Sequence, residues 1–339
     1  MTNGHLPRLA RLIADDRKFT SLIRRVHVDE AHFIYTAGLK HYGIPAFRPA
    51  WGKLGEFRIK IGSDVPLQAL SGTQPPHIKA AIIKNLLFEE SELHAIKLTS
   101  NRPNIVYATH PIVGELSDFR NLDFLVPRPY PPGWILPKAV VFHDNLKQAA
   151  EAALYHTRRL PEDMQKKGLI MHYHGSMSKE YLTQVYEDFS NPNGHCRVLH
   201  ATEGASTVWI IHVVSPVTNI LWALIGQGLD IPDITIVIQY GLTRDVPTAL
   251  QRGGRGGRSS TSEAIFLLMY ESWVKSIDLT AVEVDTVSDP DHPTVPKLSD
   301  HPTKKERSGV AMIKIIQLEN ECLRKLYASY LKDTASDGM

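Results

Sequence analysis

The second half of the chain predicts an α/β fold that is built on a parallel β-sheet. Short apolar runs typical of strands, at residues 139–142, 169–173 and 196–200, alternate with segments of helical periodicity at 146–154 and 179–189. Strands that alternate with helices favour a parallel sheet, because each helix returns the chain to the edge where the next strand starts. Ligands of such sheets collect at the carboxyl ends of the strands.

Length and proline content predict two domains. The 339 residues suffice for two domains with sizeable cores. Residues 116–137 are rich in proline, which stiffens a linker and excludes regular structure. We therefore expect a first domain over residues 1–115 and a second over 138–272. A polar, proline-containing stretch at 273–307 predicts another linker, and residues 308–339 predict a C-terminal helix.

The remaining elements follow from local signals. The apolar runs 234–239 and 264–269 predict the last strands of the second domain. Asp144 is expected to cap the helix that follows it, because an aspartate oxygen can accept from the exposed backbone amides of the first turn. In the first domain, the β-prone runs 26–28 and 67–70 predict two strands, and a turn and a proline-initiated helix are expected after the second.

The charge balance and the cysteines exclude several classes of protein. Lys and Arg number 38 against 36 Asp and Glu, so any nucleic-acid surface must be local. Cys196 and Cys322 cannot build a disulfide framework and fit a reducing compartment. Residues 1–19 carry Asp15 and Asp16 and have no apolar core, so they do not predict a secretory signal.

Residues 251–258 form the most distinctive stretch of the chain, Q-R-G-G-R-G-G-R. Arginine presents a fork of donors that fits phosphate, and glycine lets the backbone approach a ligand closely. A flexible, solvated basic loop is the alternative interpretation. The spacing Q-x-x-G-R-x-G-R resembles motif VI of superfamily 2 helicases, and the form QRGGRGGR is most similar to RecQ-type DNA helicases. The resemblance implies that Gln251, Arg255 and Arg258 serve catalysis, with both arginines reaching the γ-phosphate.

Asp29 and Glu30 directly follow the predicted strand 26–28. Of two adjacent carboxylates at a strand end, one can hold a metal ion while the other orients or deprotonates a water. The alternative is an ordinary acidic loop end. The run V-D-E-A-H resembles motif II, the DEAH box. This implies that Asp29 holds magnesium, Glu30 activates the attacking water, and His32 couples the nucleotide to the DNA site.

Two further segments resemble elements that contact DNA or couple to it. Residues 33–58 are rich in aromatic and basic side chains, which stack on bases and pair with the backbone. The segment resembles the RecQ aromatic-rich loop that ends in Phe-Arg-Pro, which implies DNA contacts by Phe47 and Arg48. This loop is longer, and Tyr42-Gly43 is the nearest substitute for the tryptophan and glycine that usually precede Phe-Arg-Pro in the family. Ser71 and Thr73 resemble motif III, which links the ATP and DNA sites; a plain turn before a helix is the alternative.

His174, in H-G-S-M, is similar to the family element Y-H-A-G-L that grips the DNA backbone, and a capped loop histidine is the alternative. Residues 201–206 resemble the start of motif V, and its expected end begins only after residues 207–226. Excising those 20 residues restores the family's spacing as A-T-E-G-A-S-Q-G-L-D-I-P-D. Motif V implies nucleic-acid contact by Thr202 and nucleotide contact by Gly228 and Asp230.

The inserted residues 207–226 are apolar and uncharged. Their length approaches the ~20 residues of a membrane-spanning helix, but Pro216, His212 and Asn219 interrupt the run and it would split a domain, so we expect no membrane partner. We hypothesise that the insert is translated from an unspliced intron. Transcript sequencing that finds no spliced form without these 20 codons would refute this hypothesis. A buried hydrophobic loop or hairpin is the alternative, and either origin predicts local strain or exposure.

As a whole, the resemblance implies two RecA-like domains of the P-loop NTPase fold. It implies an ATP-dependent helicase that uses ATP and magnesium, binds single-stranded or partly duplex DNA, and separates the strands of duplex DNA from 3′ to 5′ in repair and recombination. The implied location is the nucleus, or the cytoplasm in a prokaryote. An RNA-directed helicase of the same superfamily is the alternative. No protein partner is implied.

The family's phosphate-binding loop, G-x-x-x-x-G-K-[ST], does not occur in the sequence. In the family this loop precedes motif II, so the first domain is expected to be incomplete and the chain an N-terminally truncated fragment. A second hypothesis is therefore a catalytically inactive helicase remnant or a nucleic-acid-binding module. Cys322 resembles the first cysteine of the RecQ zinc-binding module, but structural zinc needs four ligands and the chain stops at Met339, so we expect no zinc.

Overall fold

The computed structural model describes residues 16–202, 209–214, 223–224, 231, 233–259 and 262–333. The chain forms two compact units. The N-terminal unit comprises the chain up to Leu98 together with the segment Val208–Ile225, and the C-terminal unit comprises Thr99–Thr207 and the chain from Gly226 onward. In the described part of the chain, no helix combines the length and the apolar composition that crossing a membrane requires.

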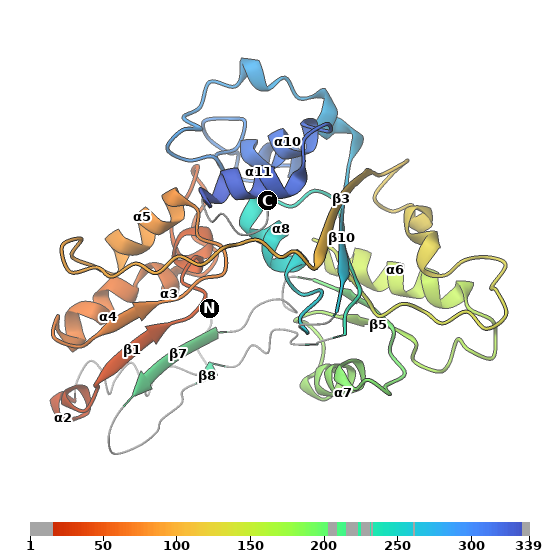
Figure 1. The fold of residues 1–339 in the computed structure, drawn as a ribbon, viewed down its shortest axis with the longest axis horizontal. Helices are drawn as coiled ribbons and strands as arrows, with labels where there is room; N and C mark the ends of the chain where they lie inside the picture. The colour runs from red at the N-terminus through yellow and green to blue at the C-terminus, as the bar shows by residue number, and fades with distance from the viewer. Residues whose placement is uncertain are drawn as a thin grey trace. The chain divides into compact units, whose positions relative to one another are not determined.

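A four-stranded sheet in the order β2-β1-β7-β8 organises the N-terminal unit (Figure 1). β1 pairs in parallel with β2, whereas β7 pairs antiparallel with both β1 and β8. The elements of this unit are α2 (Arg17–Ser21), β1 (Arg25–Val28), the π-helix η1 (Ile34–Gly38), α3 (Pro49–Gly52), α4 (Leu54–Ile61), β2 (Leu67–Ala69), α5 (Pro76–Asn85), β7 (Trp209–Val214) and β8 (Ala223–Leu224).

One apolar core holds the N-terminal unit together. Val26 and Val28 lie on the same face of β1, because successive side chains of a strand point to opposite faces, and both are buried. Ile78 and Ile82 lie four residues apart on one face of α5 and are buried in the same core. α5 begins at Pro76, where a missing amide leaves no helical hydrogen bond unmade.

Part of the apolar insert 207–226 forms strands of the N-terminal unit. β7 runs beside β1 in Figure 1, with Ile211 opposite Val28. β8 pairs with β7 in turn, with Leu224 opposite Trp209. This arrangement matches the hairpin alternative for the insert, and β7 covers an edge of β1 that would otherwise present unpaired amides and carbonyls. The origin of the insert in an intron stays a hypothesis.

Deleting residues 207–226 is expected to raise amide hydrogen exchange in β1 and to lower the soluble yield, because the edge of β1 loses its partner. Ile211→Pro should have a weaker effect of the same sign, since proline cannot donate to the ladder. Exchange of β1 that stays unchanged in the deletion variant would contradict this pairing.

Six strands form one sheet in the C-terminal unit, in the order β3-β10-β9-β4-β6-β5. All five pairings are parallel, which confirms the predicted α/β class with a parallel sheet flanked by helices. The strands are β3 (Ile105–Pro111), β4 (Ala139–Phe142), β5 (Ile170–Tyr173), β6 (Val198–Ala201), β9 (Ile236–Tyr240) and β10 (Ala264–Tyr270).

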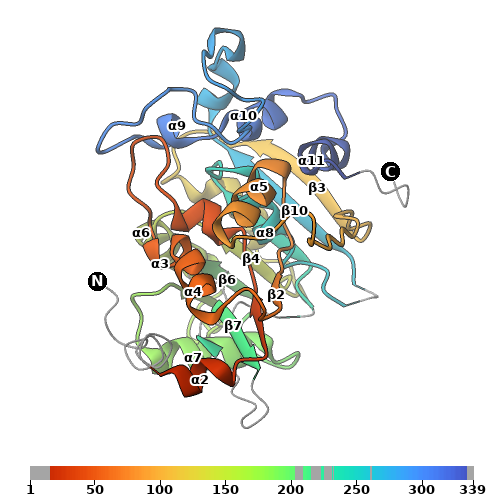
Figure 2. The same cartoon turned by 90° about the vertical axis from the view of Figure 1, so that its left-hand side faces the viewer.

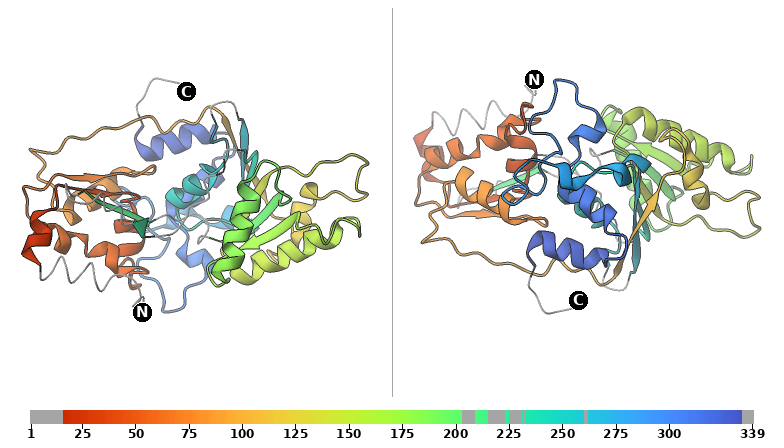
Figure 3. Two further views of the ribbon diagram at one scale, coloured as in Figure 1. Left: turned by 90° about the horizontal axis from the view of Figure 1, so that it is seen from below. Right: turned by 90° about the horizontal axis from the view of Figure 1, so that it is seen from above.

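Helices cover both faces of this sheet (Figures 1 and 3). Val140 and Phe142 of β4 point into one core, which also contains side chains of α7, α8, α10 and α11. Ala139 and Val141 point into a second core on the opposite face, which contains side chains of α6 and the 3-10 helix η2. The helices are α6 (Leu146–Arg159), α7 (Lys179–Ser190), α8 (Val246–Gly253), α10 (Val310–Gln317), α11 (Leu323–Leu331) and η2 (Phe119–Leu125).

Residues 116–137 are packed against the C-terminal unit, whereas the sequence analysis expected a linker there. Phe119, Leu122 and Leu125 recur at intervals of three, which places them on one side of a 3-10 helix, and all three are buried. The prolines that predicted irregular structure lie at the end of the segment, after this apolar repeat of three residues.

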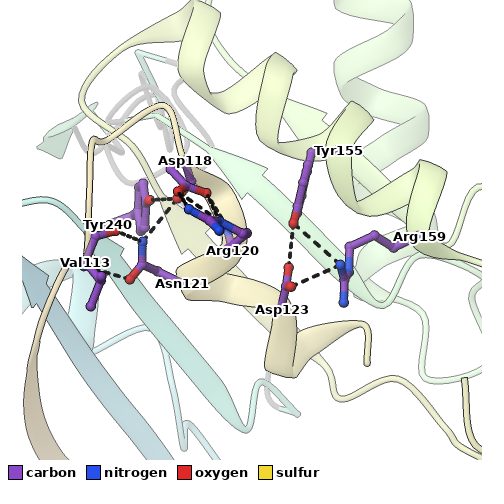
Figure 4. Close-up of polar contacts among 8 residues, drawn as sticks. All are labelled: Val113, Asp118, Arg120, Asn121, Asp123, Tyr155, Arg159 and Tyr240. Atoms are coloured by element: carbon purple, nitrogen blue, oxygen red, sulfur yellow. Dashed lines mark hydrogen bonds and ion pairs between the residues drawn. The ribbon is translucent and has the colours of Figure 1, made fainter. Parts of the chain in front are cut away.

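Polar contacts also hold this segment to the sheet and to α6 (Figure 4). Asp123 accepts a hydrogen bond from Tyr155 at 2.7 Å and pairs with Arg159 at 3.0 Å, so η2 is tied to α6. The Tyr240 hydroxyl donates to the Asp118 carbonyl at 2.8 Å, which ties the start of η2 to β9. The segment is therefore part of the C-terminal unit.

The domain boundary lies earlier than the sequence analysis placed it. β3 pairs along its whole length with β10, so it is an edge strand of the C-terminal sheet. Residues 99–115, which the sequence analysis assigned to the first domain, therefore belong to the second, and the boundary moves to Leu98 and Thr99.

The chain after β10 also belongs to the C-terminal unit. Residues 273–307, expected to be a solvated linker, include two 3-10 turns and α9 (Lys304–Arg307), with Val274 and Leu298 buried. The single helix expected over 308–339 is two helices, α10 and α11, separated at residues 318–322. Figure 2 shows α11 beside β3.

Three histidines form a hydrogen-bonded row inside the C-terminal unit. His200 of β6 lies between His143, which follows β4, and His156 of α6, with nitrogen–nitrogen distances of 2.9 and 3.0 Å. All three side chains are fully buried. Burial lowers the pKa of His143 to about 3 and that of His156 to about 4, and it lowers the pKa of His200 well below its ordinary value.

The C-terminal unit is expected to lose stability in mild acid. A histidine whose pKa is lowered by folding contributes stability above its unfolded pKa of about 6.5, and that contribution falls by up to about 1.4 kcal/mol per pH unit below it. The melting temperature should therefore be flat from pH 8 to 7 and fall steadily from pH 6.5 to 4. Replacing the exposed His110 with Gln should leave this profile unchanged, and a melting temperature equal at pH 7 and pH 5 would contradict the role of the buried row.

Candidate functional site

The acidic pair lies directly after β1, at its carboxyl end. The Glu30 amide donates to Asp29 Oδ1 at 2.8 Å, and Glu30 has a positive φ of 49°. A non-glycine residue in this left-handed region is uncommon, and it turns the chain sharply after the strand. The turn leaves both carboxylates partly exposed, at the sheet edge where ligands of parallel strands collect.

His32 joins the acidic pair to the turn after β2. Its Nδ1 lies 3.3 Å from Glu30 Oε2 and 3.0 Å from Ser71 Oγ, and the ring is almost fully buried. Ser71 in turn donates to the Thr73 carbonyl and accepts from the Thr73 amide. The structure thus links four predicted site residues through successive polar contacts, because β1 and β2 are parallel neighbours whose carboxyl ends meet.

Phe47 and Arg48 lie on the surface of the N-terminal unit, next to the start of α3. The Phe47 ring is 76% exposed, and the Arg48 guanidinium lies over it at 5.2 Å from the ring centroid. The Arg48 amide donates to the Ala37 carbonyl at 2.8 Å, which fixes the backbone of this loop. An exposed ring beside a cation can stack on a nucleic-acid base.

His174 and Thr202 lie at the carboxyl ends of neighbouring strands in the C-terminal unit. The Thr202 amide donates to the carbonyl of Tyr173, the last residue of β5, at 3.2 Å. His174 Nδ1 lies 2.9 Å from Ser176 Oγ, which is the local capping contact that the sequence analysis kept as its alternative. Gly228 and Asp230 lie outside the described residues.

The arginine loop, residues 251–258, begins in the last turn of α8 and runs along the sheet. Gln251 is half-buried, Arg255 is buried and Arg258 is exposed. The Gly257 amide donates to the Ile234 carbonyl, just before β9, so this part of the loop lies at the amino ends of the strands. Ligands of parallel sheets collect at the carboxyl ends of the strands, whereas this part of the loop lies at the opposite edge, because α8 returns the chain from the carboxyl end of β9 to the amino ends.

Arg252 was not singled out in the sequence, and it is the residue that fastens the loop. Its guanidinium is buried, donates to Asp144 Oδ1 at 2.9 Å and to Gln239 Oε1, and lies over the Phe142 ring. Asp144 therefore does not cap α6, as the sequence suggested; Asn145 caps it. Burial raises the pKa of Asp144, but Arg252 and Lys304 outweigh that effect and hold it below its ordinary value.

The glycines of the loop permit close packing on β10. A Cβ added at Gly253 would lie 2.8 Å from the Phe266 ring, and one added at Gly256 would lie 2.9 Å from the Ala264 Cβ. At Gly257 a positive φ of 58° adds a backbone requirement. The sequence analysis assigned the glycines to the approach of a ligand, and the structure gives these three a packing or backbone role.

Gly253→Ala is expected to destabilise the C-terminal unit by about 1–3 kcal/mol, because the added methyl group would lie 2.8 Å from the buried Phe266 ring and something must shift. Chemical denaturation measures the loss. Gly175→Ala is the matched control, since a Cβ at Gly175 meets no atom within 4 Å. Equal midpoints for the two variants would show that α8 can shift away from the sheet.

A second set of contacts holds the far end of the loop. Arg102 donates to the carbonyls of Gly256 and Gly257 at 3.2 and 2.8 Å, and Asn104 donates to Gly257 at 2.6 Å. Both residues belong to the segment N-R-P-N before β3.

Cys322 is exposed before α11, and among the described residues no group of three or more His, Cys, Asp and Glu could hold a metal ion.

Comparisons with known proteins agree with this architecture. Residues 136–260 match the family model described as the helicase conserved C-terminal domain, so the segment from β4 through the arginine loop is similar to that domain. The match covers only part of the chain, and no curated protein matched it.

Three solved helicase structures are similar in fold. One is Mss116p, bound to single-stranded RNA and AMP-PNP, with a TM-score of 0.54, 14% identity, and coverage of 96% of this chain and 63% of that one. Another Mss116 complex, with single-stranded RNA and UDP-BeF, has a TM-score of 0.53 and 15% identity, and the match covers 96% of this chain and 64% of that one. Mycobacterium smegmatis helicase Lhr, bound to single-stranded DNA and AMP-PNP, has a TM-score of 0.50 and 18% identity, and the match covers 77% of this chain and 30% of that one. The chain thus spans under two thirds of each.

Proposed function

We propose that this chain functions as an ATP-dependent DNA helicase of the RecQ-like type, in repair or recombination and in the nucleus of a eukaryote. The observation that carries the proposal is the match of residues 136–260 to the helicase conserved C-terminal domain, because the arginine loop lies within it. The loop's form QRGGRGGR favours RecQ-like DNA helicases over RNA-directed relatives of the same superfamily. Strand separation would proceed from 3′ to 5′.

In the proposed helicase, side chains of the acidic pair and of the arginine loop would each have a role in nucleotide hydrolysis. Magnesium bound with a nucleotide takes one or two protein carboxylates, and the partly exposed Asp29 after β1 fits that requirement. The ion, when bound, would neutralise phosphate charge. Glu30 would orient or deprotonate the attacking water, and Arg255 and Arg258 would contact the γ-phosphate. Gln251, Gly228 and Asp230 would complete the nucleotide contacts.

The side-chain contacts that link Glu30 to His32 and His32 to Ser71 support coupling between nucleotide and nucleic acid. His32 touches both Glu30 and Ser71, so a change in the position of Glu30 would reach the turn that contains Thr73. Nucleic acid would contact Phe47 and Arg48 in the N-terminal unit, and His174 and Thr202 in the C-terminal unit. Aromatic stacking and charge at these positions suit single-stranded DNA.

A second candidate function is a nucleic-acid-binding module without ATP hydrolysis. The antiparallel strand β7 favours it, because nucleotide-binding doubly wound sheets are mostly parallel. The absence of a G-x-x-x-x-G-K-[ST] run from the sequence points the same way. In this case Phe47, Arg48, His174 and Thr202 would keep their roles while Asp29 and Glu30 would not turn over nucleotide.

The ATPase rate of the purified chain, measured with and without single-stranded DNA, tests the two candidates. If the chain is a helicase, DNA should stimulate turnover, and Glu30→Gln should lower kcat by about 10²-fold or more, because it removes the base but keeps the shape. Glu89→Gln, at an exposed glutamate of the same unit, is the matched control. Single-stranded RNA in place of DNA separates the two superfamily alternatives.

Turnover that Glu30→Gln leaves intact would refute the assigned role of the acidic pair. DNA binding without turnover would support the second candidate. A chain that neither binds DNA nor hydrolyses ATP would overturn both.

A further inference from the structure

We propose that the segment after β10, residues 272–333, positions the arginine loop from both of its ends, with Lys304 and Arg324 as the two positioning residues. The geometry that supports this lies entirely within the C-terminal unit. The consequence for catalysis rests on the proposed function, whereas the consequence for the loop itself does not.

Lys304 acts on the start of the loop through Asp144. Its Nζ lies 3.3 Å from Asp144 Oδ2, while Asp144 Oδ1 accepts from Arg252. The aspartate is therefore shared by a cation of the loop and a cation of the following segment. Lys304 therefore helps to orient the carboxylate to which Arg252 donates.

Neighbouring residues leave Lys304 little freedom. Its Nζ also pairs with Glu271 Oε1 at 2.8 Å, and Glu271 Oε2 accepts from the Leu242 amide at 2.8 Å. Gly241 provides the space: a Cβ there would lie 2.4 Å from Lys304 Nζ. A capping box between Thr303 and Glu306 fixes the first turn of α9, and with it the backbone of Lys304.

Arg324 acts on the end of the loop through the segment N-R-P-N. From α11 it donates to the Asn101 side chain and the Arg102 carbonyl, both at 2.7 Å, and to the Ile105 carbonyl at 2.9 Å. Arg102 and Asn104 in turn donate to the loop carbonyls at Gly256 and Gly257. Three hydrogen bonds from one planar guanidinium thus hold the segment that in turn holds the loop.

The segment 272–333 also shares a hydrophobic core with α8. Met312, Ile313 and Ile316 of α10 lie in one core with Val246 and Ala249 of α8. α8 carries the first residues of the loop, so its position depends on α10. The two ends of the loop and the helix that leads into it therefore share one support, residues 272–333, which lies outside the helicase C-terminal match at residues 136–260.

Hydrogen exchange of the amides at residues 252–258, measured in the full chain, tests the proposal without any ligand. Lys304→Met should raise exchange there by about fivefold, because Asp144 loses one of its two cations. Lys304→Arg should restore slow exchange. Lys305→Met, at the exposed neighbouring position, is the matched control and should change nothing. Arg324→Met should raise exchange at 256–258 more than at 252–253.

Equal exchange in Lys304→Met and Lys305→Met would overturn the role of Lys304, as would failure of Lys304→Arg to restore it. Where the chain hydrolyses ATP, Lys304→Met should lower kcat more than it raises KM, since the loop acts on the transferred phosphate; an unchanged kcat would refute the catalytic consequence. If Lys304→Met raises exchange at residues 252–258 but the wild-type chain does not hydrolyse ATP, the role of Lys304 in supporting the loop stands and the helicase proposal fails instead.

Discussion

The buried contact between Arg252 and Asp144 is the interaction on which the C-terminal unit's site depends. A guanidinium in this position would be costly without its partners, because a buried charge has lost its hydration. Asp144 and Gln239 supply the acceptors, and the Phe142 ring supplies a face for the cation. These partners come from β4 and β9, the central strands of the sheet, so the orientation of α8 is fixed against the most deeply buried part of the fold.

The same contact explains why a run of glycines is stable next to the sheet. Once Arg252 holds the last turn of α8 down, Gly253 and Gly256 lie against Phe266 and Ala264 at distances that no side chain would tolerate. Glycine has many conformations in the unfolded chain, which makes such a loop costly to order. The hydrogen bonds from Arg102 and Asn104 offset part of that cost, and they leave Arg258 exposed at the end of an ordered loop.

Much of the fold could be predicted from periodicity, because strands 139–142 and 264–269 are continuous apolar runs and residues 146–154 repeat at helical spacing. The position of β3 could not, since a strand's partner is chosen by tertiary pairing rather than by its own sequence. Within the site, the chain of Glu30, His32 and Ser71 brings together residues that motif spacing had already marked.

Other features of the site have weak or misleading local signals. Asp144 carries the pattern of a helix cap, and only the fold reveals that Arg252 competes for it while Asn145 caps α6. His143, His156 and His200 are far apart in sequence and meet only because β4 and β6 are neighbours and α6 connects β4 to β5. The buried face of η2 was masked by nearby prolines, whose effect on the backbone does not extend to Phe119 or Leu122.

The discontinuity of the N-terminal unit also determines the order in which the protein can fold as it is synthesised. β1 and β2 emerge from the ribosome early, but β7, which borders β1, follows only after β3, β4, β5 and β6 have been made. The edge of β1 that pairs with β7 thus stays unpaired while four strands of the C-terminal unit are synthesised. During that interval the nascent chain would present a bare strand edge, a state that favours contact with chaperones or with other chains.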